Sequence, residues 1–404
     1  MIIKEERITM NFSNVPVFDN HTHTLDPRSI QLTPLELALN FLHGYRDVLP
    51  KTPGGPNGIS EELQLHIENM GVVHTMVNHL SKLFACEPTL QAVTEERNRR
   101  TTEGMVDYTK LLYKDAGIMG TVVESVLPMN DPIVGLFPCR IFRLFKLDNR
   151  LFELFNQYDS YLEFKQALQG KIEYAVKTEG YIGIKCHIAE VYTLDARPVY
   201  DKEAIQAYAA AKAKDREAML TVYFAIFTAT MLQCQELDIP LHIHTGVTGQ
   251  SAITGQPAFS GEIKQGHVHD TDPFLLSNFL TEPQLLNTKL VLLHAAYPWI
   301  RNAAMMAHNF PHVWVDVSWT LPWTSIGFNP IIEEILAIAP HSKIMTGSGQ
   351  HGIPEIAWLT AKVMKASLHA VLTKAVECDY LAEQQAQKTG EMVLYRNAQR
   401  LYKF

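Results

Sequence analysis

Cysteine is scarce in this sequence of 404 residues, and the few cysteines form no recognisable set. They are scattered, odd in number and without a Cys-X-X-Cys pair, at Cys86, Cys139, Cys186, Cys234 and Cys378. A disulfide framework and a thiolate zinc site are therefore not indicated. This usage is typical of a reducing compartment, so we expect the protein to be cytoplasmic.

Positive charge is also in short supply. The chain has 35 Lys and Arg residues against 43 Asp and Glu residues, for a formal net charge of −8, and no dense basic run. Nucleic acids and anionic membranes both require a basic face on their partner. We therefore expect neither as a partner.

Uninterrupted apolar runs are short. The most apolar long stretch, residues 218–244, is broken by Gln233, Gln235, Glu236 and Asp238 before it reaches about 20 apolar residues. It predicts a buried helix that leads into a strand. The first 17 residues carry charges where a signal peptide needs an apolar core, in line with the expected cytoplasmic location.

The chain does contain a repeated alternation of strand and helix patterns. Short apolar runs that end in a polar group alternate with segments of helical periodicity, such as residues 353–374. This alternation predicts parallel strands joined by right-handed crossovers. Eight such runs predict an α/β fold of the (β/α)8 TIM-barrel class, with strands at 15–21, 118–125, 139–146, 181–185, 240–244, 289–294, 312–317 and 343–348.

We expect one barrel domain over residues 1–404. A helical and loop segment is inserted around residues 30–115, and additional helices follow from about residue 375. A Pro/Gly-rich stretch at 49–58 interrupts the first crossover, and a long loop at 245–272 follows the fifth strand. Loops after the carboxyl ends of strands commonly carry function.

Polar side chains stand at the predicted carboxyl ends of the strands, which meet at one mouth in a barrel. His21 and His23 are one residue apart, so in an extended strand both point to one face, about 7 Å apart. The full set is His21, His23, Glu124, Arg143, Lys185, His244, His294, Asp316 and Ser348.

Four of these side chains are imidazoles. Neutral imidazole is a common ligand of zinc and of neighbouring divalent metals. Such an ion lowers the pKa of bound water and polarises a carbonyl group. We therefore predict a divalent metal site at the mouth, with zinc as the first choice and manganese, nickel or iron as alternatives.

Four sequence elements together resemble the amidohydrolase superfamily. They are His-Thr-His at 21–23, His-Thr-Gly at 244–246, LLHAAYPWIRNA at 292–303 and GSGQHGIPEIAWL at 347–359. The likeness is to the amidohydrolase-2 branch, which includes the amidohydrolase part of proteins fused to glutamine synthetase. It covers the chain from about residue 15.

The resemblance implies a metal-dependent hydrolase that cleaves an amide or related C–N bond of a small polar substrate. It also implies that His21, His23 and His244 are metal ligands. His294 is implied to be a catalytic group or a ligand of a second ion. Lys185 stands where binuclear members carry a carboxylated, bridging lysine; a salt-bridged or substrate-facing lysine is the alternative. These ligand assignments are compatible with one or two metal ions. The oligomeric state stays open, and a homo-oligomer is one of the options.

The sequence departs from the family at the end of the eighth strand. Relatives carry an aspartate there that binds metal and accepts a proton, whereas this chain has Gly349. His351 is a candidate catalytic replacement, and Glu355 is expected to support a helix start. A single-metal decarboxylase or lyase, or a metal-binding barrel with impaired catalysis, therefore remains an alternative.

Two further residues are candidates for substrate binding. Arg143 ends an apolar strand and is placed to clamp a carboxylate, with a solvated basic strand end as the alternative. Tyr297 lies three residues beyond His294 and either donates to a substrate oxygen or packs under a helix. The His-Val-His-Asp stretch at 267–270 is expected to be exposed to solvent.

Overall fold

A single parallel sheet organises the chain. The computed structural model describes residues 10–42, 59–125, 127–247 and 268–404. The strand order is β8-β7-β6-β5-β4-β3-β2-β1-β9, with neighbours hydrogen-bonded throughout. The strands are β1 (Val17–Leu25), β2 (Ile118–Glu124), β3 (Arg140–Lys146), β4 (Gly183–Cys186), β5 (Leu241–Ile243), β6 (Leu290–Leu292), β7 (Val313–Asp316), β8 (Ile344–Met345) and β9 (Gln350–Gly352).

The segment from β8 to β9 closes the sheet into a barrel. Asp316 of β7 pairs with Met345 of β8, and Thr22 of β1 pairs with Gln350 of β9. Between these pairs, Gly349 N donates to His21 O over 2.7 Å. The predicted eighth strand is therefore divided, with one part paired to each neighbour, and the (β/α)8 barrel class is confirmed.

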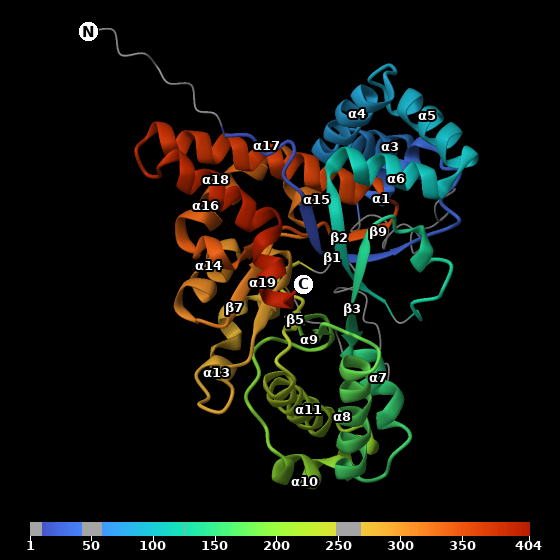
Figure 1. The fold of residues 1–404 in the computed structure, drawn as a ribbon. Helices are drawn as coiled ribbons and strands as arrows, with labels where there is room; N and C mark the ends of the chain where they lie inside the picture. The colour runs from blue at the N-terminus through green and yellow to red at the C-terminus, as the bar shows by residue number, and fades with distance from the viewer. Residues whose placement is uncertain (1–9, 43–58, 126, 248–267) are drawn as a thin grey trace.

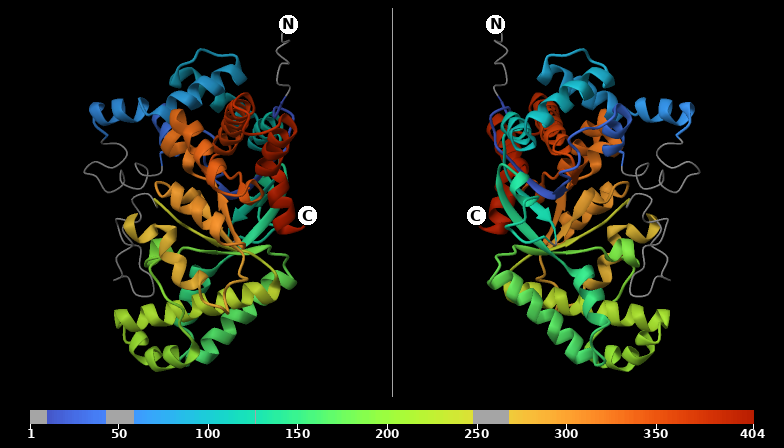
Figure 2. Two further views of the ribbon diagram at one scale, coloured as in Figure 1. Left: turned by 90° about the vertical axis from the view of Figure 1, so that its left-hand side faces the viewer. Right: turned by 90° about the vertical axis from the view of Figure 1, so that its right-hand side faces the viewer.

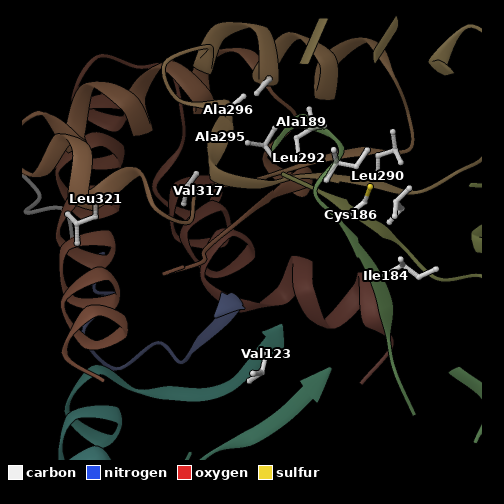
Figure 3. Packing of buried hydrophobic residues seen from close by; sticks show 14 of the residues in the cluster. Val123, Ile184, Cys186, Ala189, Leu290, Leu292, Ala295, Ala296, Val317 and Leu321 are labelled. Carbon is white, nitrogen blue, oxygen red and sulfur yellow. The ribbon is translucent and has the colours of Figure 1, made fainter. Parts of the chain in front are cut away.

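Alternate side chains of the strands line two different cores. The outward-facing core joins the sheet to the helices, and Figure 3 shows some of its members from β2, β4 and β6, including Val123, Ile184 and Leu292. The second core fills the barrel and includes residues of the C-terminal helix α19 (Asn397–Tyr402). This interior cluster consists of Phe18, Val122, Phe142, Leu144, Val291, Leu293, Met345, Ala398, Leu401 and Tyr402.

The described part of the predicted insertion is helical. Between β1 and β2 the helices gather at the upper right of Figure 1, and Figure 2 places them at one end of the molecule. They are α1 (Pro34–Asn40), α3 (Glu61–Glu68), α4 (Gly71–Phe84), α5 (Leu90–Glu103) and α6 (Met105–Ala116). The Pro/Gly-rich stretch at 49–58 lies outside the described residues.

The remaining crossovers also carry helices. They are α7 (Leu147–Phe155) and α8 (Tyr161–Lys177) after β3; α9 (Ile188–Val191), α10 (Asp201–Lys212) and α11 (Arg216–Leu237) after β4; α13 (Ser277–Leu280) after β5; α14 (Ile300–Asn309) after β6; α15 (Thr320–Thr324) and α16 (Phe328–Ile338) after β7; and α17 (Glu355–Glu377) and α18 (Glu383–Glu391) after β9, ahead of α19.

In the described part of the chain, α11 has the length and apolar composition of a membrane span, but most of it is buried. It leads into β5, as the sequence predicts.

A buried ion pair fastens the inserted helices to the barrel. Arg97 Nε of α5 donates to Glu355 Oε1 over 2.8 Å, and both side chains are inaccessible to solvent. The Tyr108 hydroxyl donates to the same oxygen over 2.8 Å, and Arg97 Nη1 donates to Ile30 O over 2.9 Å. Glu355 thus begins α17, as expected, and also anchors the insertion.

We predict that Arg97→Met lowers the free energy of unfolding by about 3–5 kcal/mol, because it leaves the Glu355 carboxylate buried without its cation. Arg99→Met on the same helix is the matched control, since Arg99 is an exposed partner of Glu96 and Glu103 and its loss should leave the unfolding midpoint almost unchanged. Urea unfolding of both variants measures the difference. Equal midpoints would show that the buried pair anchors nothing.

Candidate metal centre and active site

Two histidines and a glutamate form a compact donor group at the mouth of the barrel. His21 Nε2 and His23 Nε2 lie 3.9 Å and 4.0 Å from Glu124 Oε2. One possible ligand atom from each of the three residues lies within 4.8 Å of the other two. The strand alternation explains this arrangement, because Thr22 between the histidines turns away to contact the Thr121 hydroxyl and the Val122 carbonyl of β2.

This donor group suits a divalent metal ion. His21 is completely buried, and neither of its ring nitrogens has a hydrogen-bond partner among the described residues. Burial lowers the pKa of His21 well below its usual value and the pKa of His23 to about 3. Both imidazoles are therefore neutral, which is the form that binds metal. A buried ring without a hydrogen-bond partner is costly unless another partner is available.

Three cationic side chains surround the carboxylate of Glu124. Lys146 Nζ lies 2.8 Å from Oε1, His187 Nε2 lies 3.2 Å from Oε1, and Lys185 Nζ lies 3.5 Å from Oε2. Burial alone would raise the pKa of Glu124, but His187, Lys185 and their neighbours hold it well below its usual value. Glu124 is therefore ionised.

The His187 imidazole is itself held by an acid. Its Nδ1 lies 3.2 Å from Asp148 Oδ2, its backbone N donates to the same oxygen over 2.7 Å, and the Tyr223 hydroxyl donates to Asp148 Oδ1. Burial opposes the charge on His187, yet Glu124 and other acids raise its pKa to about 9. His187 is therefore an imidazolium at neutral pH.

Our predicted site did not include Lys146, Asp148 or His187. Each nevertheless follows a spacing rule that the sequence displays. The pairs Lys146/Asp148 and Lys185/His187 repeat the two-residue step of His21 and His23, with Lys146 and Lys185 in β3 and β4 and with Asp148 and His187 just beyond these strands. A search for this step that was not limited to histidine pairs would have marked them as candidates.

The structure brings His244 and His294 next to the donor group. The ring centroids of His244 and His294 lie 4.5 Å apart, and those of His294 and His21 lie 5.3 Å apart. Burial lowers the pKa of both His244 and His294 well below the usual value. His244 lies outside the three-residue donor group, and its Nδ1 is 3.1 Å from Glu190 Oε1. A carboxylate partner of this kind commonly orients a metal-binding histidine.

A strained turn directs His294. His294, Ala295 and Ala296 have φ values of 66°, 45° and 51°, a left-handed conformation that is uncommon for residues other than glycine. Such strain is concentrated at functional sites. His294 Nδ1 lies 2.9 Å from Ser318 Oγ.

Other predicted residues also have definite positions. Lys185 is an ion-pair partner of Glu124, which corresponds to the salt-bridged alternative; its carboxylation stays a prediction. His351 stacks on His23, with ring centroids 3.5 Å apart and planes 17° apart. Tyr297 is half-buried and packs against the outward-facing core, as in its packing alternative.

Arg143 lies away from the mouth, contrary to the expected substrate clamp. Its guanidinium donates to the Tyr181 hydroxyl over 3.1 Å and to the Glu179 carbonyl over 3.0 Å. The reason is the strand alternation. Arg143 pairs with Val123, whose side chain belongs to the outward-facing core. The residue of β3 that reaches the site is Lys146.

Gly349 occupies a position that demands glycine. Its φ is +65°, and a Cβ atom there would lie 2.3 Å from Trp319 Cδ1. An aspartate at this position would therefore require Trp319 to move, and Gly349→Asp by itself does not cleanly restore the family's carboxylate. Most of the predicted loop at 245–272, with His267 of the His-Val-His-Asp stretch, lies outside the described residues.

Comparison with protein families finds a match over the whole second half of the chain and part of the first half. The family model described as Amidohydrolase (Amidohydro_2) matches residues 166–404. Protein fluG of Emericella nidulans is 24% identical over 254 residues. That match covers 59% of this chain and 27% of fluG, so the chain spans only a part of this relative.

Solved structures share the fold over nearly the whole chain. A protein described as a metal-dependent hydrolase from Lactobacillus casei has a TM-score of 0.78 at 18% identity and covers 98% of both chains. Glucuronate isomerase from Caulobacter crescentus has a TM-score of 0.67 at 15% identity, covering 97% of this chain and 92% of its own. Uronate isomerase from Thermotoga maritima has a TM-score of 0.65 at 15% identity, covering 96% and 95%.

We predict that the double change His21→Ala and His23→Ala removes bound metal, because it deletes two of the three clustered donors while the barrel core stays intact. Metal content of protein purified without chelator is measured by mass spectrometry, and circular dichroism checks the fold. His66→Ala, at an exposed position on α3, is the control. Full metal occupancy in the double variant would contradict the assignment.

We also predict that Gly349→Ala destabilises the protein by at least about 1 kcal/mol, because an L-residue is strained at this φ and its Cβ meets Trp319. Gly170→Ala in α8 is the matched control: a Cβ there meets nothing within 4 Å, and the change should stabilise by about 0.5–1 kcal/mol. Thermal unfolding compares the two. A neutral Gly349→Ala would refute the stated role of this glycine.

Proposed function

Because the chain belongs to the amidohydrolase family, we propose that it is a metal-dependent hydrolase that cleaves an amide or related C–N bond of a small polar substrate. The observation that carries the proposal is the largely buried donor group of His21, His23 and Glu124 at the barrel mouth, in which neither His21 nitrogen has a hydrogen-bond partner within the described parts of the chain. The mouth is where barrels of this class place their active sites.

The residues proposed to hold the metal are His21, His23, Glu124 and His244. Nitrogen and carboxylate donors suit zinc, with manganese, nickel or iron as alternatives. When bound, the ion would supply Lewis acidity toward a water molecule and a substrate carbonyl. Glu190 orients His244 through the contact at Nδ1.

Lys185 completes the charge balance of this proposal. Its ammonium lies 3.5 Å from Glu124 and would repel a divalent ion placed on the same carboxylate. Carboxylation would replace that positive charge by a negative one. The charge pattern thus favours a carboxylated Lys185 in the metal-loaded protein, as the family resemblance implies, and would permit a second ion.

His294 is the proposed proton acceptor in place of the family's aspartate. Burial keeps its imidazole neutral, and its Nδ1 is engaged by Ser318, so Nε2 is the nitrogen left to accept a proton. This role corresponds to the catalytic alternative for His294. It differs from stabilising an oxyanion, because an unprotonated nitrogen cannot donate a hydrogen bond. His187, charged at neutral pH, is better suited to stabilise developing negative charge. His351, stacked on His23, is the second candidate for proton transfer.

We predict that the zinc- or manganese-loaded chain hydrolyses at least one member of a panel of amides, and that His294→Ala lowers kcat/KM by about 10²- to 10⁴-fold, the usual contribution of a general base. The amount of hydrolysis product is measured by chromatography. His66→Ala serves as the control, because His66 is exposed on α3.

Three results would replace the hydrolase proposal. The panel also includes uronates, since two structural relatives are named as uronate or glucuronate isomerases. Conversion of a uronate without hydrolysis of any amide would favour isomerisation. Ligand-induced thermal shifts without any product would favour a metal-binding protein, and release of carbon dioxide from a carboxylate substrate would favour the decarboxylase alternative.

A further inference from the structure

A chain of buried hydrogen bonds runs inside the barrel from His294 to Tyr402 in the C-terminal helix α19. Ser318 Oγ lies 2.9 Å from His294 Nδ1 and also bonds to Asp316 Oδ1. Asn20 Nδ2 donates to Asp316 Oδ2 over 2.8 Å, and the Tyr402 hydroxyl donates to Asn20 Oδ1. All five side chains are buried.

The number of available protons fixes the direction of each bond. The Ser318 hydroxyl has one proton, which it gives to Asp316, so it must accept from His294 Nδ1. The backbone N of Ser318 also donates to Asp316 Oδ1, over 2.9 Å. Donors thus converge on Asp316 from Ser318 and from Asn20. His294 is left with a proton on Nδ1 and a lone pair on Nε2.

The far end of the chain is fixed by packing. The Tyr402 ring belongs to the interior cluster and lies 6.1 Å from the Phe18 ring. Its oxygen lies 3.0 Å from His242 Nε2, which is the donor in that contact because the Tyr402 proton goes to Asn20. The orientation of the hydroxyl is therefore set by residues of β1, β5 and α19.

We propose that Asp316 and Ser318 are positioning residues that hold His294 in the Nδ1–H tautomer, and that Tyr402 holds Asp316 in place through Asn20. The inference rests on the proposed function, in which Nε2 of His294 accepts a proton. The C-terminal helix thereby acts on the active site from inside the barrel. A carboxylate that fixes the tautomer of an imidazole in this way can be worth orders of magnitude in rate.

The tautomer can be read directly by nitrogen NMR of the full chain labelled with ¹⁵N in its histidine rings and incubated with zinc. Protonated and unprotonated ring nitrogens resonate in separate regions, and His294→Gln identifies the His294 signals. We expect a protonated Nδ1 and an unprotonated Nε2 in the unaltered chain. Ser318→Ala should lose this preference, and Ser318→Thr, which keeps the hydroxyl, should retain it.

Tyr402→Phe tests the remote end, because it deletes the hydroxyl and keeps the ring. We expect a mixture of the two His294 tautomers in this variant. Phe404→Leu is the matched control, since Phe404 packs on Phe18 and Phe142 at the same end of the barrel. It should leave the His294 signals unaltered.

The inference is overturned if Ser318→Ala keeps the Nδ1–H tautomer, or if Tyr402→Phe gives the spectrum of the unaltered chain. The NMR measurement requires no catalytic turnover, so the tautomer inference can be contradicted independently of the proposed function. A chain that hydrolyses amides with His294 in mixed tautomers contradicts the positioning network alone. A chain with a fixed tautomer and no turnover supports the network and contradicts the hydrolase.

Discussion

The arrangement of charged side chains at the barrel mouth depends on the negative charge of Glu124. Lys185 is 1% exposed, and Lys146 and His187 are largely buried, so the charge of each needs a nearby anion to offset it away from water. Glu124 supplies that anion to all three. The neutral pair His21 and His23 adds no charge and can lie against the same carboxylate. Removing Glu124 would therefore leave buried cations uncompensated, a cost that goes beyond the loss of one metal ligand.

Most of the fold could be predicted from the sequence because most strands are short apolar runs that end in a polar residue and are separated by segments of helical periodicity. The eighth strand is the exception. The sequence predicts one run at 343–348, but only Ile344–Met345 pairs with β7, and the pairing to β1 begins at Gln350. That division depends on barrel closure and on the positive φ of Gly349, neither of which has a periodic signature.

The candidate site was partly predictable, because some of its residues form a local sequence pattern and others do not. His21 and His23 stand out as a pair of histidines at a fixed step. Lys146 and His187 take part in the same step, but only their contact with Glu124, which is distant in sequence, assigns them to the site. Arg143 shows how sensitive the inference is to register. A side chain one position from an inward-facing residue points to the opposite face of the strand, and nothing about an arginine at an apolar strand end reveals which face that is.

The same charge pattern constrains how a metal could be bound. A divalent ion held by His21, His23 and Glu124 would add two positive charges beside Lys146, Lys185 and the His187 imidazolium. Glu124 and Asp148, the acid partner of His187, cannot offset all of them in a low-dielectric site. Metal binding would therefore be coupled to a change in the charge of a neighbour. Lys185, which contacts the Glu124 oxygen that faces both His21 and His23, is the neighbour whose change of charge would act most directly on the ion.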